Sequence, residues 1–135
     1  MKYINKKLFI EKVSVESIAK RYGTPTYCYS YDRLKKNIIN FKKNFKPFSP
    51  LICFAIKSNT NLNLIREIKK LGLGADVVSM GELMIAIKAG INPQKIVFSG
   101  VGKTSSEIAY AIDKKILLIN AESKSEIEEI NRIAK

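Results

Sequence analysis

The sequence predicts an α/β fold built on a parallel sheet. Short apolar runs typical of strands alternate four times with helical segments between residues 51 and 135, and the connections between them are short. Alternation of this kind gives parallel strands joined by right-handed crossovers. The composition agrees, since 46% hydrophobic and 27% charged residues are normal for a folded globular domain.

The chain before residue 51 predicts two helices and one strand. Ser14 precedes a short helical segment that ends at Gly23, and an aromatic, strand-like run, TYCYS, follows at 26–30. From 32 to 46, apolar residues recur at helical spacing with lysines opposite them. This pattern indicates an amphipathic helix.

The first strand of the repeating part is expected in the run LICFAIKSNTN at 51–61, which is almost wholly apolar, as in a strand buried on both faces. One lysine, Lys57, stands at its far end. If the strand belongs to a β/α barrel, catalytic groups collect at this end, and a partly desolvated amine there is a good nucleophile toward carbonyls. The plainer interpretation is a lysine whose stem reaches water.

Three further strands and four helices complete the pattern. The predicted strands are 75–79, 95–99 and 116–120, and the predicted helices are 62–71, 81–89, 105–113 and 125 to the end. Ser125 and Glu128 have the spacing of a capping box. Four units allow either a small open doubly wound sheet or half of an eight-stranded barrel, which needs about 250 residues.

Several functional classes are not favoured. The formal charge of +12 comes from lysines spread through every segment, without interleaved aromatics or an arginine cluster, so we expect no nucleic-acid partner. No apolar run approaches the roughly 20 residues that span a bilayer, so we expect no membrane partner. Cys28 and Cys53 have neither CxxC spacing nor a histidine, which predicts no metal site and two buried small hydrophobes.

Three motifs in order resemble a known family. They are FAIKSNTN at 54–61, LGLGADVVSMGEL at 71–83 and AGINPQKIVFSGVGKT at 89–104. Together they resemble the amino-terminal half of the barrel of diaminopimelate decarboxylases, pyridoxal-phosphate enzymes of alanine-racemase-like fold. YGTPTYCYS at 22–30 resembles the segment that leads into this barrel.

The resemblance spans roughly 14–130 and favours the half barrel. It implies the N-terminal half of a pyridoxal-phosphate-binding (β/α)8 TIM-type barrel, preceded by a short helix and a strand that pairs with a separate C-terminal β-domain in the intact enzyme. The implied domains are an opening helix and strand over 1–31 and a partial cofactor-binding barrel over 32–135.

The resemblance also assigns site residues. It makes Lys57 the lysine that carries pyridoxal 5′-phosphate as a Schiff base. Asp76 and Glu82 match acidic positions near the cofactor, which would orient neighbouring groups and balance the lysine. Without the family, Asp76 is a strand-start cap and Glu82 an ordinary first-turn residue favoured by the helix dipole.

The glycine-containing loop GVGKT at 100–104 needs a separate interpretation. It joins a strand to a helix but lacks phosphate-loop spacing, so we do not expect an anion site there. Ser99 and Gly100, at the preceding strand end, would leave room for the cofactor ring.

The activity implied for the full-length protein is decarboxylation of meso-2,6-diaminopimelate to L-lysine by a cytoplasmic homodimer. We expect the 135-residue chain alone to be inactive or nearly so. It has no histidine, and the family's ring-stacking histidine, phosphate loop and substrate-gripping residues belong to later segments. Arginine, ornithine or carboxynorspermidine decarboxylation, or a non-catalytic homologue that acts by binding subunits, remain alternatives.

Overall fold

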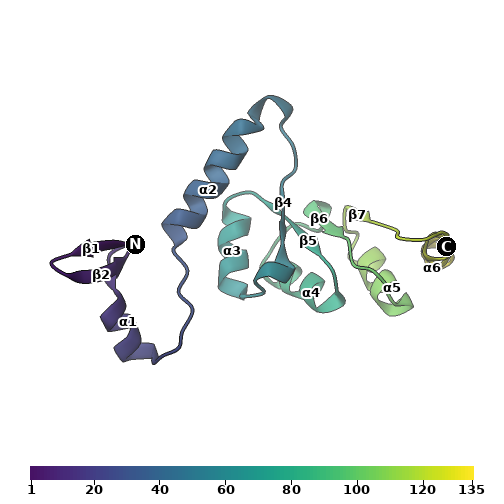
Figure 1. Cartoon of the computed structure of the whole chain (residues 1–135). Helices are drawn as coiled ribbons and strands as arrows, with labels where there is room; N and C mark the ends of the chain where they lie inside the picture. Colours follow the sequence, from purple (N-terminus) through teal and green to yellow (C-terminus); the bar gives the residue numbers. More distant parts are fainter. The chain divides into compact units, whose positions relative to one another are not determined.

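Four short parallel strands form a sheet within residues 48–135 (Figure 1). The computed structural model describes all 135 residues. The strand order is β4-β5-β6-β7, and every neighbouring pair is parallel. The strands are β4 (Cys53–Ala55), β5 (Gly74–Val77), β6 (Ile96–Phe98) and β7 (Leu118–Ile119). The prediction of four parallel strands is confirmed.

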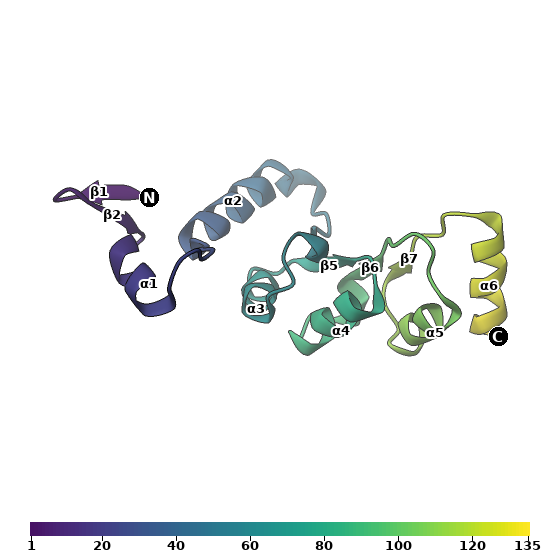
Figure 2. The same ribbon diagram turned by 60° about the horizontal axis from the view of Figure 1, so that its bottom comes forward.

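Helices follow each of these strands. They are α3 (Leu62–Lys70), α4 (Met80–Lys88), α5 (Ser105–Asp113) and α6 (Lys124–Ala134), with short 3-10 turns η2 (Ile56–Ser58) and η3 (Pro93–Lys95). Figure 2 shows α3, α4 and α5 lying along one side of the sheet. The four predicted strand–helix units are therefore present in the predicted order.

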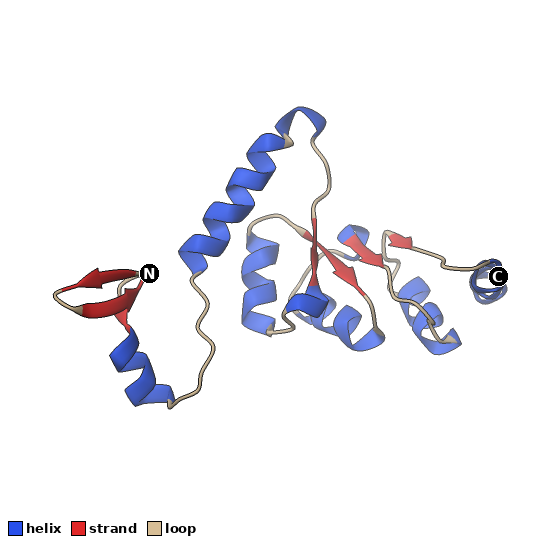
Figure 3. Cartoon of the chain, in the orientation of Figure 1, coloured by secondary structure: helices blue, strands red, loops and turns tan.

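Met1–Pro47 forms a second compact unit. It contains a three-stranded antiparallel sheet and two helices, coloured red and blue in Figure 3. Its elements are β1 (Lys2–Ile4), β2 (Lys7–Ile10), β3 (Val13–Ser14), α1 (Val15–Tyr22) and α2 (Tyr31–Asn44); the turn η1 (Lys46–Phe48) follows. The boundary between the two units falls between Pro47 and Phe48 in the sequence. The domain boundary expected after residue 31 stays a prediction.

The small sheet at the start of the chain was not predicted, and the strand predicted at 26–30 is wrong. Asn5 and Lys6 both have positive φ, of 49° and 63°, as the two central residues of a type I′ hairpin turn require. Residues 26–30 form no strand. No strand of residues 1–47 pairs with them, and β propensity without a ladder partner does not make a strand.

Three smaller expectations also need correction. The strand in 51–61 covers only Cys53–Ala55, whose side chains are half-buried rather than covered on both faces. Helix α6 is capped by Ser123, whose Oγ accepts from the Glu126 backbone N–H, and Ser125 already lies inside the helix. Cys28 is exposed and not a buried hydrophobe, because it belongs to the unpaired segment 26–30.

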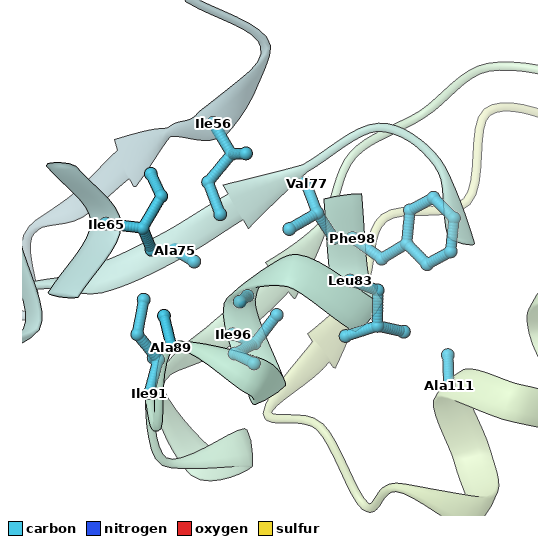
Figure 4. Close-up of a cluster of buried hydrophobic side chains, with 11 residues drawn as sticks. Ile56, Ile65, Ala75, Val77, Leu83, Ala89, Ile91, Ile96, Phe98 and Ala111 are labelled. Carbon is cyan, nitrogen blue, oxygen red and sulfur yellow. The ribbon is translucent and has the colours of Figure 1, made fainter. Parts of the chain in front are cut away.

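The core of residues 48–135 lies between the sheet and α3, α4 and α5 (Figure 4). β5 and β6 each send two side chains into it, and η2, α3, α4 and α5 supply most of the others. Residues with no exposed surface are Ile56, Ile65, Ile68, Ala75, Val77, Leu83, Ala86, Ile96, Phe98, Ile108 and Ala111. Burial of this one apolar layer is the main stabilising contribution to the unit.

Phe98 is the largest of these fully buried side chains. We expect Phe98→Ala to lower the free energy of unfolding by about 3–5 kcal/mol, because the substitution removes the ring and leaves a cavity. Urea denaturation followed by circular dichroism measures this change. Phe48→Ala is the matched control, because its ring is 78% exposed; an equal loss in both variants would contradict the proposed core.

Candidate functional site

The carboxyl ends of β4–β7 meet at one edge of the sheet, here called the carboxyl edge. The ladder continues beyond the strand ends, since Ser99 N–H donates to Val77 O at 2.8 Å and Asn120 N–H donates to Phe98 O at 2.9 Å. Lys57 follows β4 in the turn η2. Polar side chains that follow β4, β6 and β7 therefore share this edge.

The strand register separates the two faces of the sheet. Ala55, Asp76, Val97 and Leu118 are aligned across the four strands, and aligned residues of parallel strands point to the same face. The alternate residues fill the core beneath the helices. We call the face with Asp76 the open face, because no helix of residues 48–135 packs on it (Figure 2).

Lys57 lies at the carboxyl edge with its amine free. The preceding residue, Ile56, is fully buried and fixes the turn in the core. Ser58 Oγ donates to Ala55 O at 2.8 Å, and Asn59 N–H donates to Ile56 O at 2.9 Å. Lys57 itself is exposed and makes no hydrogen bond or ion pair within the chain. A turn anchored in the core therefore carries an accessible primary amine.

Asp76 lies on the open face of β5, beside Ala55 of β4. Its Oδ1 is buried and has no hydrogen-bond partner. A buried acceptor left without a donor costs about 1–3 kcal/mol, so this oxygen is suited to a donor that the chain does not supply. Burial, and then the charge of Asp76, raises the pKa of the Cys53 thiol on the same face.

Glu82 has a structural role at the start of α4. Its Oε2 accepts from Val78 N–H at 3.0 Å, and its own N–H donates to Ser79 Oγ at 3.3 Å. These bonds fix the backbone between β5 and α4 at the carboxyl edge. No ion pair joins Glu82 or Asp76 to Lys57. The three predicted residues lie in the turn after β4, in β5 and in the first turn of α4.

A glutamate also fixes the start of α5. Thr104 and Glu107 form a capping box, and Glu107 Oε1 also accepts from Met80 N–H at 3.0 Å. This last bond connects the first turns of α5 and α4. Hydrogen bonds from Thr104 N–H and then Met80 N–H hold the pKa of Glu107 below its ordinary value.

The GVGKT loop is engaged within the protein itself. Lys103 Nζ donates to Asn120 O at 2.6 Å and pairs with Glu126 at 3.2 Å. This ammonium is therefore already engaged by partners within the chain. Sequence reasoning missed Lys103 and Asn120 as partners, although the position of Asn120 at the end of the strand predicted over 116–120 was a usable signal.

No group of three or more His, Cys, Asp or Glu side chains could hold a metal ion. None of the helices combines the length and apolar character needed to cross a membrane.

Gly100 is required by close packing at the carboxyl edge. A Cβ at this position would overlap the Val78 carbonyl and press on the Phe98 ring. We expect Gly100→Ala to lower the free energy of unfolding by about 1–3 kcal/mol, as overpacking does. Gly81→Ala is the control, since its Cβ meets only Ser79 Oγ, at 3.9 Å. Urea titrations in which both variants match the wild type would contradict this packing.

The lowered pKa of Glu107 predicts acid sensitivity. A carboxylate whose pKa is depressed on folding stabilises the fold above its ordinary value of 4.5, and this contribution is lost as pH falls through the folded value. We expect Glu107→Gln to be less stable than the wild type at neutral pH, with the gap closing below about pH 4.5. Glu128→Gln, which removes only an exposed ion pair, should follow the wild type throughout. Urea midpoints measured from pH 3 to 7 compare them.

Comparison with known proteins identifies the family. The family model described as "Pyridoxal-dependent decarboxylase, pyridoxal binding domain" matches residues 31–135. Diaminopimelate decarboxylase of Aquifex aeolicus is 45% identical over 134 residues, which are 99% of this chain and 31% of that protein. Diaminopimelate decarboxylase of Helicobacter pylori strain J99 is 47% identical over 119 residues, which are 88% of this chain and 29% of that protein.

A solved structure agrees with these sequence matches. Diaminopimelate decarboxylase from M. jannaschii superposes with a TM-score of 0.94 at 36% identity, covering 98% of this chain and 32% of that one. The chain spans about a third of the length of the relatives it matches. Both the resemblance and the predicted α/β fold are confirmed, and the chain belongs to the pyridoxal-dependent decarboxylases, matched in their pyridoxal binding domain.

Proposed function

We propose that this chain supplies the lysine side of the pyridoxal-phosphate site in a diaminopimelate decarboxylase, which converts meso-2,6-diaminopimelate to L-lysine. The matches over nearly the whole chain are to proteins of that name. Solved diaminopimelate decarboxylases from H. pylori and M. jannaschii contain L-lysine. Because the chain spans about a third of such proteins, the activity and its substrate are assigned to the whole protein.

The observation that carries the proposal is the placement of Lys57. Its free amine follows a strand of a parallel sheet at the carboxyl edge, on a turn anchored by the buried Ile56. A primary amine that is unpaired and accessible can attack a carbonyl carbon. Lys57 Nζ would therefore hold the cofactor covalently and exchange protons with a substrate bound beside it.

Asp76 supports the fit of a pyridoxal group at this edge. Its buried Oδ1 lacks a donor within the chain, and the open face around it bears no packed helix of residues 48–135. Asp76 would accept a hydrogen bond from the bound group and balance the positive charge near Lys57. Pyridoxal phosphate, when bound, supplies an electron sink for the carbanion that loss of carbon dioxide leaves.

Glu82 would act on the same site through the backbone. By fixing Val78 N–H and the first turn of α4, it sets the loop that follows the strand of Asp76. We propose an orienting role for Glu82, without contact to the reacting atoms. The homodimer and the cytoplasmic location implied by the resemblance stay predictions.

Other decarboxylases of the same fold are less well supported. An arginine decarboxylase of Paramecium bursaria Chlorella virus is only 21% identical, which reflects the fold alone. An ornithine decarboxylase of Entamoeba histolytica is 25% identical with a TM-score of 0.62. The higher identity to diaminopimelate decarboxylases favours that substrate.

Reductive labelling tests the role of Lys57. We expect pyridoxal phosphate followed by borohydride to label Lys57 of the full-length protein selectively, as peptide mapping would show, and the total label per chain to fall sharply in Lys57→Ala. Lys88→Ala, which removes an exposed lysine at the end of α4, should leave the labelling unchanged. Labelling spread evenly over the lysines would contradict the proposal.

Turnover of the full-length protein provides the second measurement. We expect carbon dioxide release from meso-2,6-diaminopimelate to fall by roughly 10²–10⁴-fold or more in Lys57→Ala, the range that a positioned proton-transfer group contributes. Full activity in this variant would contradict a catalytic role. Preferred release from arginine or ornithine would instead reassign the substrate.

A further inference from the structure

Lys103 is a buried charge at the carboxyl edge that the proposed reaction does not use. Only 1% of its side chain is exposed. Its Nζ donates to the Asn120 backbone carbonyl at 2.6 Å, pairs with Glu126 at 3.2 Å, and lies 5.7 Å from the centre of the Phe98 ring. Lysine is almost never fully buried unless it is paired, so these partners determine its position.

Glu126 holds the other side of the pair from the first turn of α6. Its second carboxylate oxygen accepts from Glu122 N–H at 2.7 Å, and its backbone N–H donates to Ser123 Oγ at 3.1 Å. The Glu122 hydrogen bond and then Lys103 lower the pKa of Glu126. The carboxylate is therefore fixed to the helix start while it holds the ammonium of the neighbouring loop.

This pair controls the geometry of Asn120. The Asn120 carbonyl is bound by Lys103, and its N–H donates to Phe98 O at 2.9 Å. Its side-chain Nδ2 donates to Ser99 Oγ at 3.0 Å. The end of β7 is thereby held against the end of β6, with an amide and a hydroxyl side by side at the carboxyl edge.

The Asn120 bond gives Ser99 a defined chemical role. A serine hydroxyl that accepts through its oxygen keeps its hydrogen to donate elsewhere. Ser99 follows Val97 by two residues, so it continues the side of the sheet that bears Asp76. It lies two strands from β4, about 10 Å at roughly 4.8 Å per strand, which is within the span of a pyridine ring with its substituents.

We propose that Lys103 is a positioning residue of the pyridoxal site, which holds Asn120 so that the Ser99 hydroxyl donates a hydrogen bond to an oxygen of the cofactor. This inference rests on the proposed function. It adds a donor at the end of β6 to the lysine that follows β4 and the carboxylate on β5. Lys103 itself stays buried and touches no ligand.

The test measures, in the full-length protein, the yield of borohydride-fixed label at Lys57 at limiting pyridoxal phosphate, per folded protein. We expect about a tenfold lower yield in Lys103→Met, the lower end of the loss that follows when the hydrogen-bond partners of metal ligands are removed. Asn120→Ala and Ser99→Ala, which leave the Lys103–Glu126 pair intact, should lose as much. Lys88→Met is the matched control and should label like the wild type.

A double variant separates positioning from general stability. If Lys103 acts through Asn120, Lys103→Met combined with Asn120→Ala loses no more label than either single variant. The side-chain amide signals of Asn120 in ¹⁵N NMR should also shift or broaden in Lys103→Met, with no cofactor added. A purely structural role would lower the urea midpoint while the label per folded protein stays constant.

The outcomes distinguish this inference from the proposed function. If the wild type is not labelled at Lys57, the proposed function fails, and this inference fails with it. If Lys57 is labelled equally in the wild type and in folded Lys103→Met, only the positioning role is refuted. Should Lys103→Met fail to fold, unchanged labelling in Asn120→Ala and Ser99→Ala refutes it instead.

Discussion

The site depends on the register of the four parallel strands. Alignment of Ala55, Asp76, Val97 and Leu118 sends the alternate side chains of β5 and β6 into the core and leaves Asp76 on the open face. A slip of one residue in β5 would exchange the two faces, moving Asp76 into the apolar layer and Val77 out of it. Because the core holds this register, the same burial that stabilises the sheet also orients the candidate site.

Helix starts connect neighbouring units at the carboxyl edge. Glu82, Glu107 and Glu126 each accept backbone hydrogen bonds at the first turn of a helix, and two of them reach further. Glu107 reaches the start of α4, and Glu126 reaches the loop before α5. The connections that follow β5, β6 and β7 are thus linked to one another at the edge where Asp76 and Ser99 lie.

Sequence reasoning succeeded where patterns are local and repeated. Apolar periodicity was sufficient for the strand–helix order, and the motifs around Lys57 were sufficient for the family. It failed where two local signals compete, since both Ser123 and Ser125 have a glutamate three residues later and only the backbone decides between them. The Lys103–Glu126 pair and the orphaned Oδ1 of Asp76 depend on contacts between distant segments, which no local pattern encodes.

The two features least explained by stability are the ones that the proposed chemistry needs. An unpartnered buried oxygen on Asp76 costs free energy, and the amine of Lys57 gains none, because it forms no ion pair. An ion pair between Lys57 and Asp76 would give each group a partner. It would also leave neither the amine free to react nor the carboxylate oxygen free to accept a hydrogen bond. Residues that are locally unfavourable while their neighbours are well satisfied tend to mark function. Lys103 is the contrast, since a lysine whose ammonium is already engaged in the fold can orient a site but cannot react in it.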